Sequence, residues 1–291
     1  MIGLDAEIAE RIAAVLGAHP VRARPLSGGC IAEVRRVVLD DGRTVVAKIA
    51  PQAGGHAGGL AVEAMMLDYL GRRAPLPVPE VLLDDDDLLV MTDLGGGGRL
   101  DAAAQAEAAD HVAALHAVTS TRFGLAKDTV IGPLHQPNTP TDSWVAFFRE
   151  QRLLPMAKLA RERGHLSPRG FMQVKALAHK LPQLIPEPPA ASLLHGDLWG
   201  GNVVVGADGQ VAGFIDPAIY YGDAEMDLAF GTLFGTFGKP FFERYHARAG
   251  IRPGFFETRR DLYNLYPLLV HAAIFGGSYG REVEAGLERF V

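Results

Sequence analysis

The spacing of apolar and polar positions predicts a β-rich N-terminal part. Residues 5–17 carry apolar side chains at a period of about 3.6, which predicts a short helix. Residues 32–50 form two strand-type runs around Asp41-Gly42, a dipeptide that favours a hairpin because both positions tolerate positive φ. Residues 59–73 have helical spacing, and residues 78–94 predict a strand, an acidic turn and a strand. The predicted order is therefore strand, strand, helix, strand, strand.

Beyond residue 98 the pattern becomes mainly helical. The glycines at 95–98 predict a flexible break. Helical periodicity then covers residues 100–119, 142–163, 168–182, 223–249 and 255–290, and β-type runs at 192–198 and 211–217 interrupt it. These patterns predict an α+β, bilobal architecture. The expected domains are a small lobe with an antiparallel sheet at residues 1–94 and a larger, mainly helical lobe at residues 95–291.

Composition and charge narrow the class of protein. The chain has 291 residues, of which 48% are hydrophobic and 21% charged, as in a folded globular protein. A net charge of −6 provides no broad positive field, so nucleic acid is not an expected partner. We find no apolar run of membrane-spanning length, no signal-peptide pattern and a single cysteine. A cytoplasmic enzyme without membrane association is expected, either a monomer or a homodimer.

Two groups of polar residues have ordinary structural explanations. The four aspartates Asp84 to Asp87 are candidates for a cation site, but a solvated hairpin tip is favoured because their charges repel one another. His116 and His195 are expected to be interior histidines with hydrogen-bond partners. No His or Cys cluster in the sequence has the spacing of a zinc site.

The segment "LLHGDLWGGNVVV" carries the strongest chemical signal. Asp197 follows a strand-type run, Asn202 comes five positions later, and Asp216 lies fourteen beyond that. This is the spacing of a phosphotransfer catalytic loop and metal-binding loop. The pattern predicts Asp197 as the catalytic base and Asn202 and Asp216 as oxygen ligands for Mg²⁺. The alternatives are a loop-capping acid, a turn residue and a helix N-cap, respectively.

A second group of residues predicts an ATP site. Lys48 ends a predicted strand, Glu63 lies fifteen residues on in the first long helix, and a glycine-rich turn at 27–29 precedes both. This order is typical of the protein-kinase-like fold. Lys48 is expected to hold the α and β phosphates and Glu63 to orient it, although a strand-end lysine is often only solvated. The backbone of Gly28, Gly29 and Cys30 is expected to approach the phosphates.

The predicted hinge "VMTDL" completes the nucleotide site. Met91 is expected to line the back of the adenine pocket, with the carbonyl of Thr92 and the amide of Leu94 facing the base edge. Cys30 on the glycine-rich turn raises the hypothesis of a redox switch, against the commoner alternative of a structural thiol.

The motifs depart from those of protein kinases and match a different branch of the fold. The catalytic loop has "HGD" in place of HRD, and the metal loop has "DPA" in place of DFG. The chain resembles small-molecule kinases such as aminoglycoside phosphotransferases and choline kinases. Four segments narrow the match within this branch: "GGCIAEV", "PNTPTDSWVAFFREQRLLP", "HGDLWGGN" and "FIDPAIYYGDAEMDLAF". Together they resemble the fructosamine/ketosamine-3-kinase family, and the resemblance extends from about residue 5 to about residue 285.

The resemblance implies an activity. Members of that family phosphorylate the 3-hydroxyl of ketosamines, either free or formed on protein lysines, and are regarded as deglycating because the phosphorylated adduct is labile. It also implies that Asp227 accepts hydrogen bonds from the catalytic-loop backbone. The candidates for the sugar or amine pocket are aromatic or acidic, with core packing as the alternative for each: Trp144, Trp199, Tyr220, Tyr221 and Asp223.

Two other functions remain open from the sequence. An aminoglycoside phosphotransferase would carry many acids in the helical lobe, and this chain has few beyond residues 223–227. A nucleotide-binding pseudokinase would commonly lack one of Lys48, Asp197, Asn202 and Asp216, all of which are present.

Overall fold

The computed structural model describes residues 3–26, 32–50 and 59–291, in two compact units. Unit 1 comprises Met1–Ala104 and Gly201–Pro217, and unit 2 comprises Gln105–Gly200 and Ala218–Val291. The domain boundary predicted between residues 94 and 95 remains a prediction. The two units differ from it, because unit 1 also contains Gly201–Pro217. One reason is the pairing of the glycine run with the second segment of unit 1. The Gly98 N–H donates to the Val205 carbonyl at 3.0 Å, and a Cβ at Gly98 would lie 2.1 Å from the Gly206 oxygen.

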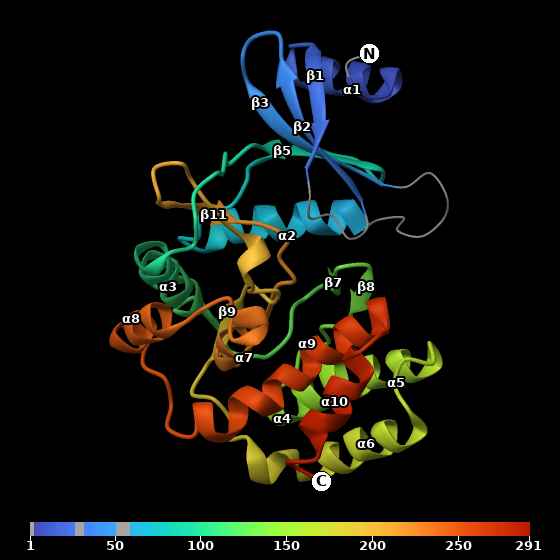
Figure 1. Cartoon of the computed structure of the whole chain (residues 1–291), viewed down its shortest axis with the longest axis vertical. Helices are drawn as coiled ribbons and strands as arrows, with labels where there is room; N and C mark the ends of the chain where they lie inside the picture. Colours follow the sequence, from blue (N-terminus) through green and yellow to red (C-terminus); the bar gives the residue numbers. More distant parts are fainter. Residues whose placement is uncertain (1–2, 27–31, 51–58) are drawn as a thin grey trace. The chain divides into compact units, whose positions relative to one another are not determined.

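Unit 1 contains a five-stranded antiparallel sheet (Figure 1). In spatial order its strands are β1 (Pro20–Pro25), β2 (Glu33–Leu39), β3 (Thr44–Ile49), β5 (Leu88–Thr92) and β4 (Val81–Asp84). The β2–β3 hairpin confirms the turn predicted at Asp41-Gly42, and Gly42 has a φ of 89°. The first strand, β1, was not expected from the sequence. Prolines stand at both of its ends, and an edge strand tolerates them because only one side is paired.

Two helices cover the two faces of this sheet. Helix α1 (Ala6–Leu16) buries Ile12 against a cluster that includes Leu88 and Val90 of β5. Helix α2 (Gly59–Arg73) packs Leu67 and neighbouring residues on a second cluster that includes Leu89 and Met91. Because successive side chains of a strand point to opposite faces, the alternation along β5 divides the core of unit 1 into two layers.

The acidic turn between β4 and β5 is exposed, as predicted. Asp84 to Asp87 are all exposed, and the Arg11 guanidinium of α1 lies 2.8 Å from Asp85 and 2.7 Å from Asp87. The pKa of Asp87 is lowered by its hydrogen bond to Arg11.

The second segment of unit 1 is a two-stranded hairpin. Strands β10 (Val203–Val205) and β11 (Val211–Phe214) pair antiparallel after the short 3₁₀ helix η2 (Gly200–Asn202). The Phe214 N–H donates to the Pro77 carbonyl at 2.8 Å, which joins this hairpin to the segment before β4.

Unit 2 is mainly helical. Its helices are α3 (Ala102–His116, of which the first three residues belong to unit 1), α4 (Trp144–Phe147), α5 (Leu154–Glu162), α6 (Pro168–Leu184), α7 (Glu225–Phe230), α8 (Lys239–Ala249), α9 (Arg260–Phe275) and α10 (Tyr279–Leu287). The π-helical turns η1 (Phe148–Leu153) and η4 (Phe255–Arg259) precede α5 and α9, and η3 (Leu233–Gly235) is a 3₁₀ turn. A small sheet has the order β12 (Tyr220–Gly222), β9 (Ala191–Leu194), β6 (Thr119–Ser120), and β7 (Thr129–Ile131) pairs with β8 (Leu134–Gln136).

Two of the predicted helical segments are broken. Residues 223–249 form α7 and α8 with an irregular stretch between them that contains Gly231, Gly235 and Gly238. Residues 255–290 break between α9 and α10 at Gly276-Gly277, whose φ values of 65° and 61° end the helix. The apolar periodicity was correct, but glycine ended the helices earlier than predicted. Within the described part of the chain, we find no helix whose length and apolar character would let it cross a membrane.

Candidate active site

Lys48, Glu63 and Asp216 meet in unit 1. Lys48 stands near the end of β3, paired with Val34 of β2 and Leu89 of β5, and its side chain is buried. Its Nζ lies 2.5 Å from Glu63 Oε1 of α2 and also forms an ion pair with Asp216 Oδ1. The predicted spacing thus brings the lysine and the helix acid together, and the chain returns after β11 to add a second carboxylate.

The charges within this cluster act on the pKa of Lys48 and on that of Glu63. Burial alone would lower the pKa of Lys48, but the carboxylates of Glu63 and Asp216 outweigh burial and raise it. Burial raises the pKa of Glu63, and the charge of Asp216 adds to this rise, whereas Lys48 opposes it. One ammonium group therefore faces the carboxyl groups of two acids.

Asn202 and Asp216 lie at the same end of the β10–β11 hairpin. Val203 pairs with Phe214, and the Ile215 N–H donates to the Asn202 carbonyl at 3.0 Å. Asp216 has a φ of 55°, a left-handed conformation that Asp adopts more readily than most residues. An amide and a carboxylate are hard oxygen donors, and Mg²⁺ usually takes one or two such groups together with phosphate oxygens. Among residues 3–26, 32–50 and 59–291 no group of three or more His, Cys, Asp or Glu forms a metal cage. The donor set fits Mg²⁺.

The hinge residues lie at the end of β5 and directly after it. Met91 is buried in the α2-side core of unit 1, and the Thr92 hydroxyl accepts the Glu80 N–H at 2.9 Å. Leu94 is half-buried. Gly28, Gly29 and Cys30 lie outside the described residues.

In unit 2 the loop that carries Asp197 is held by Asp227 of α7. The Asp227 carboxylate accepts the His195 N–H at 2.7 Å and the Gly196 N–H at 2.9 Å, which confirms the expected supporting role. His116 and His195 are both buried, and His116 bonds to Asp227 and to the Tyr245 hydroxyl, so the expectation of interior histidines is confirmed. Asp197 itself is half-buried.

Glycine is required next to Asp197. Gly196 has a φ of 84°, and a Cβ there would lie 1.9 Å from the Ala218 carbonyl oxygen. The Ala218 N–H donates to the His195 carbonyl at 2.7 Å. The Asp197 loop and the segment after Pro217 are therefore packed backbone to backbone.

Trp199 belongs to an exposed aromatic group in unit 2. Its side chain is 36% exposed and meets Phe234 edge to face, with the ring centres 6.2 Å apart. Phe234 is 50% exposed, lies 5.1 Å from the ring of His271, and has a φ of 57°, a strained conformation for a bulky residue. The sequence did not predict that Phe234 and His271 belong to this aromatic group, because no pattern of residue types indicates a positive φ at a phenylalanine.

The other proposed substrate residues are core residues in this structure. Trp144 is fully buried, and its Nε1 donates to the Tyr263 hydroxyl at 2.9 Å. Asp223 is 2% exposed and forms an ion pair with Arg252 at 2.5 Å, and burial raises its pKa. Tyr220 and Tyr221 are buried in β12. The structure supports core packing for these four side chains and does not support contact with a substrate.

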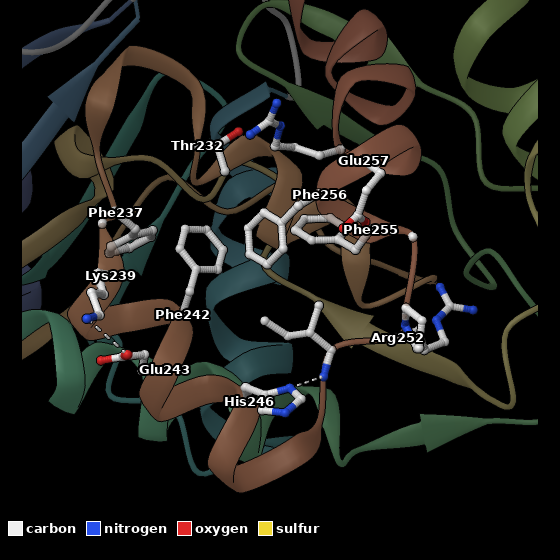
Figure 2. Close-up of a pocket in the computed structure, with 15 residues that line it drawn as sticks. Thr232, Phe237, Lys239, Phe242, Glu243, His246, Arg252, Phe255, Phe256 and Glu257 are labelled. Carbon is white, nitrogen blue, oxygen red and sulfur yellow. Dashed lines mark hydrogen bonds and ion pairs between the residues drawn. The ribbon is translucent and has the colours of Figure 1, made fainter.

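Unit 2 also contains a cavity of about 680 Å³ at α8 and η4 (Figure 2). Phe237, Phe242, Phe255 and Phe256 give it an aromatic lining. Polar groups at its rim are paired with one another: Lys239 lies 3.5 Å from Glu243, and His246 accepts the Ile251 N–H at 3.0 Å (Figure 2). None of the predicted site residues lines this cavity.

The chain is similar to known proteins over almost its whole length. Residues 4–291 match the family profile described as "Fructosamine kinase". The "Probable ketoamine kinase" of Synechocystis sp. is 36% identical over 290 residues, which cover 97% of this chain and 95% of that protein.

Solved structures agree with this match. The crystal structure of a "putative fructosamine-3-kinase" from Thermobifida fusca YX-ER1 superposes with a TM-score of 0.86 at 32% identity, covering 99% of this chain and 100% of that one. A macrolide 2'-phosphotransferase type I, at 19% identity, shares the fold with a TM-score of 0.64 over 99% of this chain and 98% of its own. The fold is therefore the kinase-like fold that the sequence predicts. The chain is an ATP-dependent kinase and belongs to the fructosamine kinase family.

Proposed function

We propose that the protein transfers the γ-phosphoryl group of ATP to the 3-hydroxyl of a ketosamine, a sugar joined to an amine. The observation that carries the proposal is the cluster of Lys48, Glu63 and Asp216 in a chain of the fructosamine kinase family. A buried lysine held by a helix acid is the arrangement that kinases use to bind ATP phosphates.

The residues of unit 1 would bind the nucleotide. Lys48 would hold the α and β phosphates and Glu63 would keep its ammonium in place. The backbone of Gly28, Gly29 and Cys30 would contact the phosphates, and Met91, Thr92 and Leu94 would surround the adenine. Asn202 and Asp216 would be the protein ligands of Mg²⁺. When bound, Mg²⁺ supplies positive charge to the phosphate oxygens of the transferred group and of the leaving ADP.

Asp197 would act as the base. As the bond between substrate O3 and the γ-phosphorus forms and the bond to the ADP oxygen breaks, the O3 proton passes to the Asp197 carboxylate. The hydrogen bonds from His195 and Gly196 to Asp227 support this role, because they fix the backbone next to the acid. Trp199 would offer an aromatic face to the sugar, since part of its ring is exposed.

The biological consequence would be deglycation. A phosphate on O3 makes the sugar adduct labile, so the enzyme would release the free amine from small ketosamines or from glycated protein lysines.

The test is ATP consumption by the purified protein with a panel of acceptors. The panel holds fructosamine, ribulosamine and erythrulosamine derivatives of lysine, a glycated protein, kanamycin and choline. We expect turnover with at least one ketosamine and none with kanamycin or choline. Turnover of kanamycin alone would contradict the ketosamine assignment and leave the kinase assignment in place.

A further inference from the structure

Arg152 is a buried cation in unit 2 without a carboxylate partner among the described residues. It lies in η1 and is fully buried. Its guanidinium stacks on Tyr220, with 3.9 Å from Cζ to the ring centre, and on Phe147 at 4.6 Å. Nη1 donates to the Pro137 carbonyl at 2.6 Å. Burying a charge without a counter-charge costs free energy. Packing does not explain this cost, because an apolar side chain of similar size would fill the same space.

The guanidinium begins a buried polar network. Arg152 Nη2 donates to Asn138 Oδ1 at 2.5 Å, and Asn138 Nδ2 donates to the Thr129 hydroxyl at 2.8 Å. Gln136 Nε2 donates to the same hydroxyl at 2.8 Å. The Tyr266 hydroxyl of α9 donates to Gln136 Oε1 at 2.8 Å. All five side chains are buried, so each bond is protected from competition with water.

The network ends on the backbone beside the proposed base. Gln136 Nε2 donates a second hydrogen bond, to the Ala218 carbonyl at 3.0 Å. The Ala218 N–H donates to the His195 carbonyl at 2.7 Å, and Ala218 is also the residue against which Gly196 is packed. His195 precedes Asp197 by two positions in the chain. A displacement of Gln136 would therefore move the backbone that carries Asp197.

Tyr266 also lies near Arg152 itself, with 5.9 Å from the guanidinium carbon to the centre of the Tyr266 ring. Burial raises the pKa of Tyr266 to about 12, the charge of Arg152 opposes that rise, and the charge of Asp197 adds to it. The Tyr266 hydroxyl therefore lies in the field of both groups, which agrees with the hydrogen-bonded path.

We propose that Arg152, Gln136 and Tyr266 are positioning residues for phosphoryl transfer, which hold the Ala218 backbone and through it the segment that carries Asp197. The role rests on the proposed function, in which Asp197 receives the substrate proton. Arg152 fixes Asn138 and Thr129, these orient the Gln136 amide, and Tyr266 holds the opposite end of that amide. None of the three side chains needs to touch a substrate.

The test compares two tyrosines of α9. Tyr266→Phe removes the hydroxyl that holds Gln136. Tyr263→Phe is the control, because Tyr263 is equally buried and both bonds of its hydroxyl, to Asp223 at 2.7 Å and from Trp144 Nε1 at 2.9 Å, lie outside the network. Loss of one buried hydrogen bond that acts on the transition state should lower kcat about tenfold. We expect this fall for Tyr266→Phe with the KM for ATP unchanged, and kcat within about twofold of the unaltered protein for Tyr263→Phe.

Two further measurements separate positioning from stability. Arg152→Lys keeps the charge but loses the planar fork, so its kcat should also fall while the KM for ATP stays unchanged, measured at a temperature below the melting transition of each variant. Amide hydrogen exchange should accelerate at residues 195–197 and 218–220 in Tyr266→Phe and not in Tyr263→Phe. An unchanged kcat in Tyr266→Phe, or an equal fall in Tyr263→Phe, would overturn the positioning role.

The exchange measurement also keeps this inference separate from the proposed function. If the unaltered protein phosphorylates no ketosamine, the proposed function fails. If amide hydrogen exchange at residues 195–197 is unchanged in Tyr266→Phe, the network does not hold this backbone in place. That result would contradict the inference whether or not any acceptor is phosphorylated.

Discussion

The ammonium of Lys48 lies 2.5 Å from a carboxylate oxygen of Glu63, which joins β3 to α2. Both side chains are largely removed from water, and the second contact of Lys48, to Asp216, completes a cluster of one cation and two anions. Such a lysine is held in one position before ATP binds, because two acceptors fix its Nζ.

Glu63→Gln should weaken ATP use. The amide keeps the shape of the side chain but removes the charge that holds Lys48, so Lys48 would turn to Asp216 alone. We expect kcat/KM for ATP to fall about ten- to a hundredfold, as measured by steady-state kinetics. Asp68→Asn on the same helix is the control, because Asp68 is an exposed partner of Arg72 and should leave kcat/KM unchanged. An unaffected Glu63→Gln enzyme would remove Glu63 from the site.

Asp227→Asn should lower kcat and stability together. The amide oxygen can keep one of the bonds from His195 and Gly196, but its NH₂ group would face a second backbone N–H. A buried donor left without an acceptor costs about 1–3 kcal/mol of unfolding free energy. Urea unfolding checks the stability and initial rates check kcat, which should fall at least about tenfold. Full activity in the folded variant would show that the Asp197 loop keeps its position without this carboxylate.

The sequence predicted the parts of the site that depend on spacing within one element or between neighbouring elements. Lys48 and Glu63 meet because the helix that follows β3 packs on one face of the sheet to which β3 belongs. The hairpin at Asp41-Gly42 and the helix at 59–73 follow from local periodicity and turn chemistry, which a single segment contains.

Other features depend on contacts that no local pattern contains. Trp144 and Trp199 have the same side chain, but only the fold buries the first and leaves the second 36% exposed. Strand β1 was not predicted, because prolines stand at both of its ends, and it forms because the outer edge of β2 is available for pairing. The neighbours of Arg152 include Asn138, Tyr220 and Tyr266, so its burial could not be predicted from "FFREQRLLP" alone.

Trp199→Ala should raise the KM for the ketosamine about three- to tenfold and leave the KM for ATP unchanged, because the lost aromatic face would contact only the sugar. Phe256→Ala is the matched control, since Phe256 is also partly exposed, at 42%, and lines the cavity at α8 and η4. Equal effects of the two variants on the ketosamine KM would argue against a sugar contact at Trp199.

His271 should make folding stability depend on pH. Burial lowers the pKa of its imidazole, against the opposing effects of its hydrogen bond to the Pro267 carbonyl and of the Glu282 charge. The unfolded chain therefore binds this proton more readily. The stability from neutral His271 is complete above pH of about 6.5 and decreases as the pH falls below that value.

Urea unfolding at pH of about 7.5 and about 5.5 tests this dependence. His271→Gln should lose less stability between the two pH values than the unaltered protein. His179→Gln, at an exposed position of α6, should behave like the unaltered protein. An equal loss in His271→Gln and the unaltered protein would contradict the shifted pKa.

Transfer of a phosphoryl group to O3 with Asp197 as the base is tested most directly by phosphorus NMR. The product formed by the unaltered protein is compared with that formed by Asp197→Asn. We expect one new phosphate ester coupled to the proton on C3 of the ketosamine. We also expect the rate of its formation to fall by about 10²- to 10⁴-fold in Asp197→Asn. Asp208→Asn, an exposed acid of the β10–β11 turn, should retain the full rate. A phosphate at another hydroxyl would contradict transfer to O3, and an Asp197→Asn variant that keeps its rate would contradict the role of Asp197 as the base.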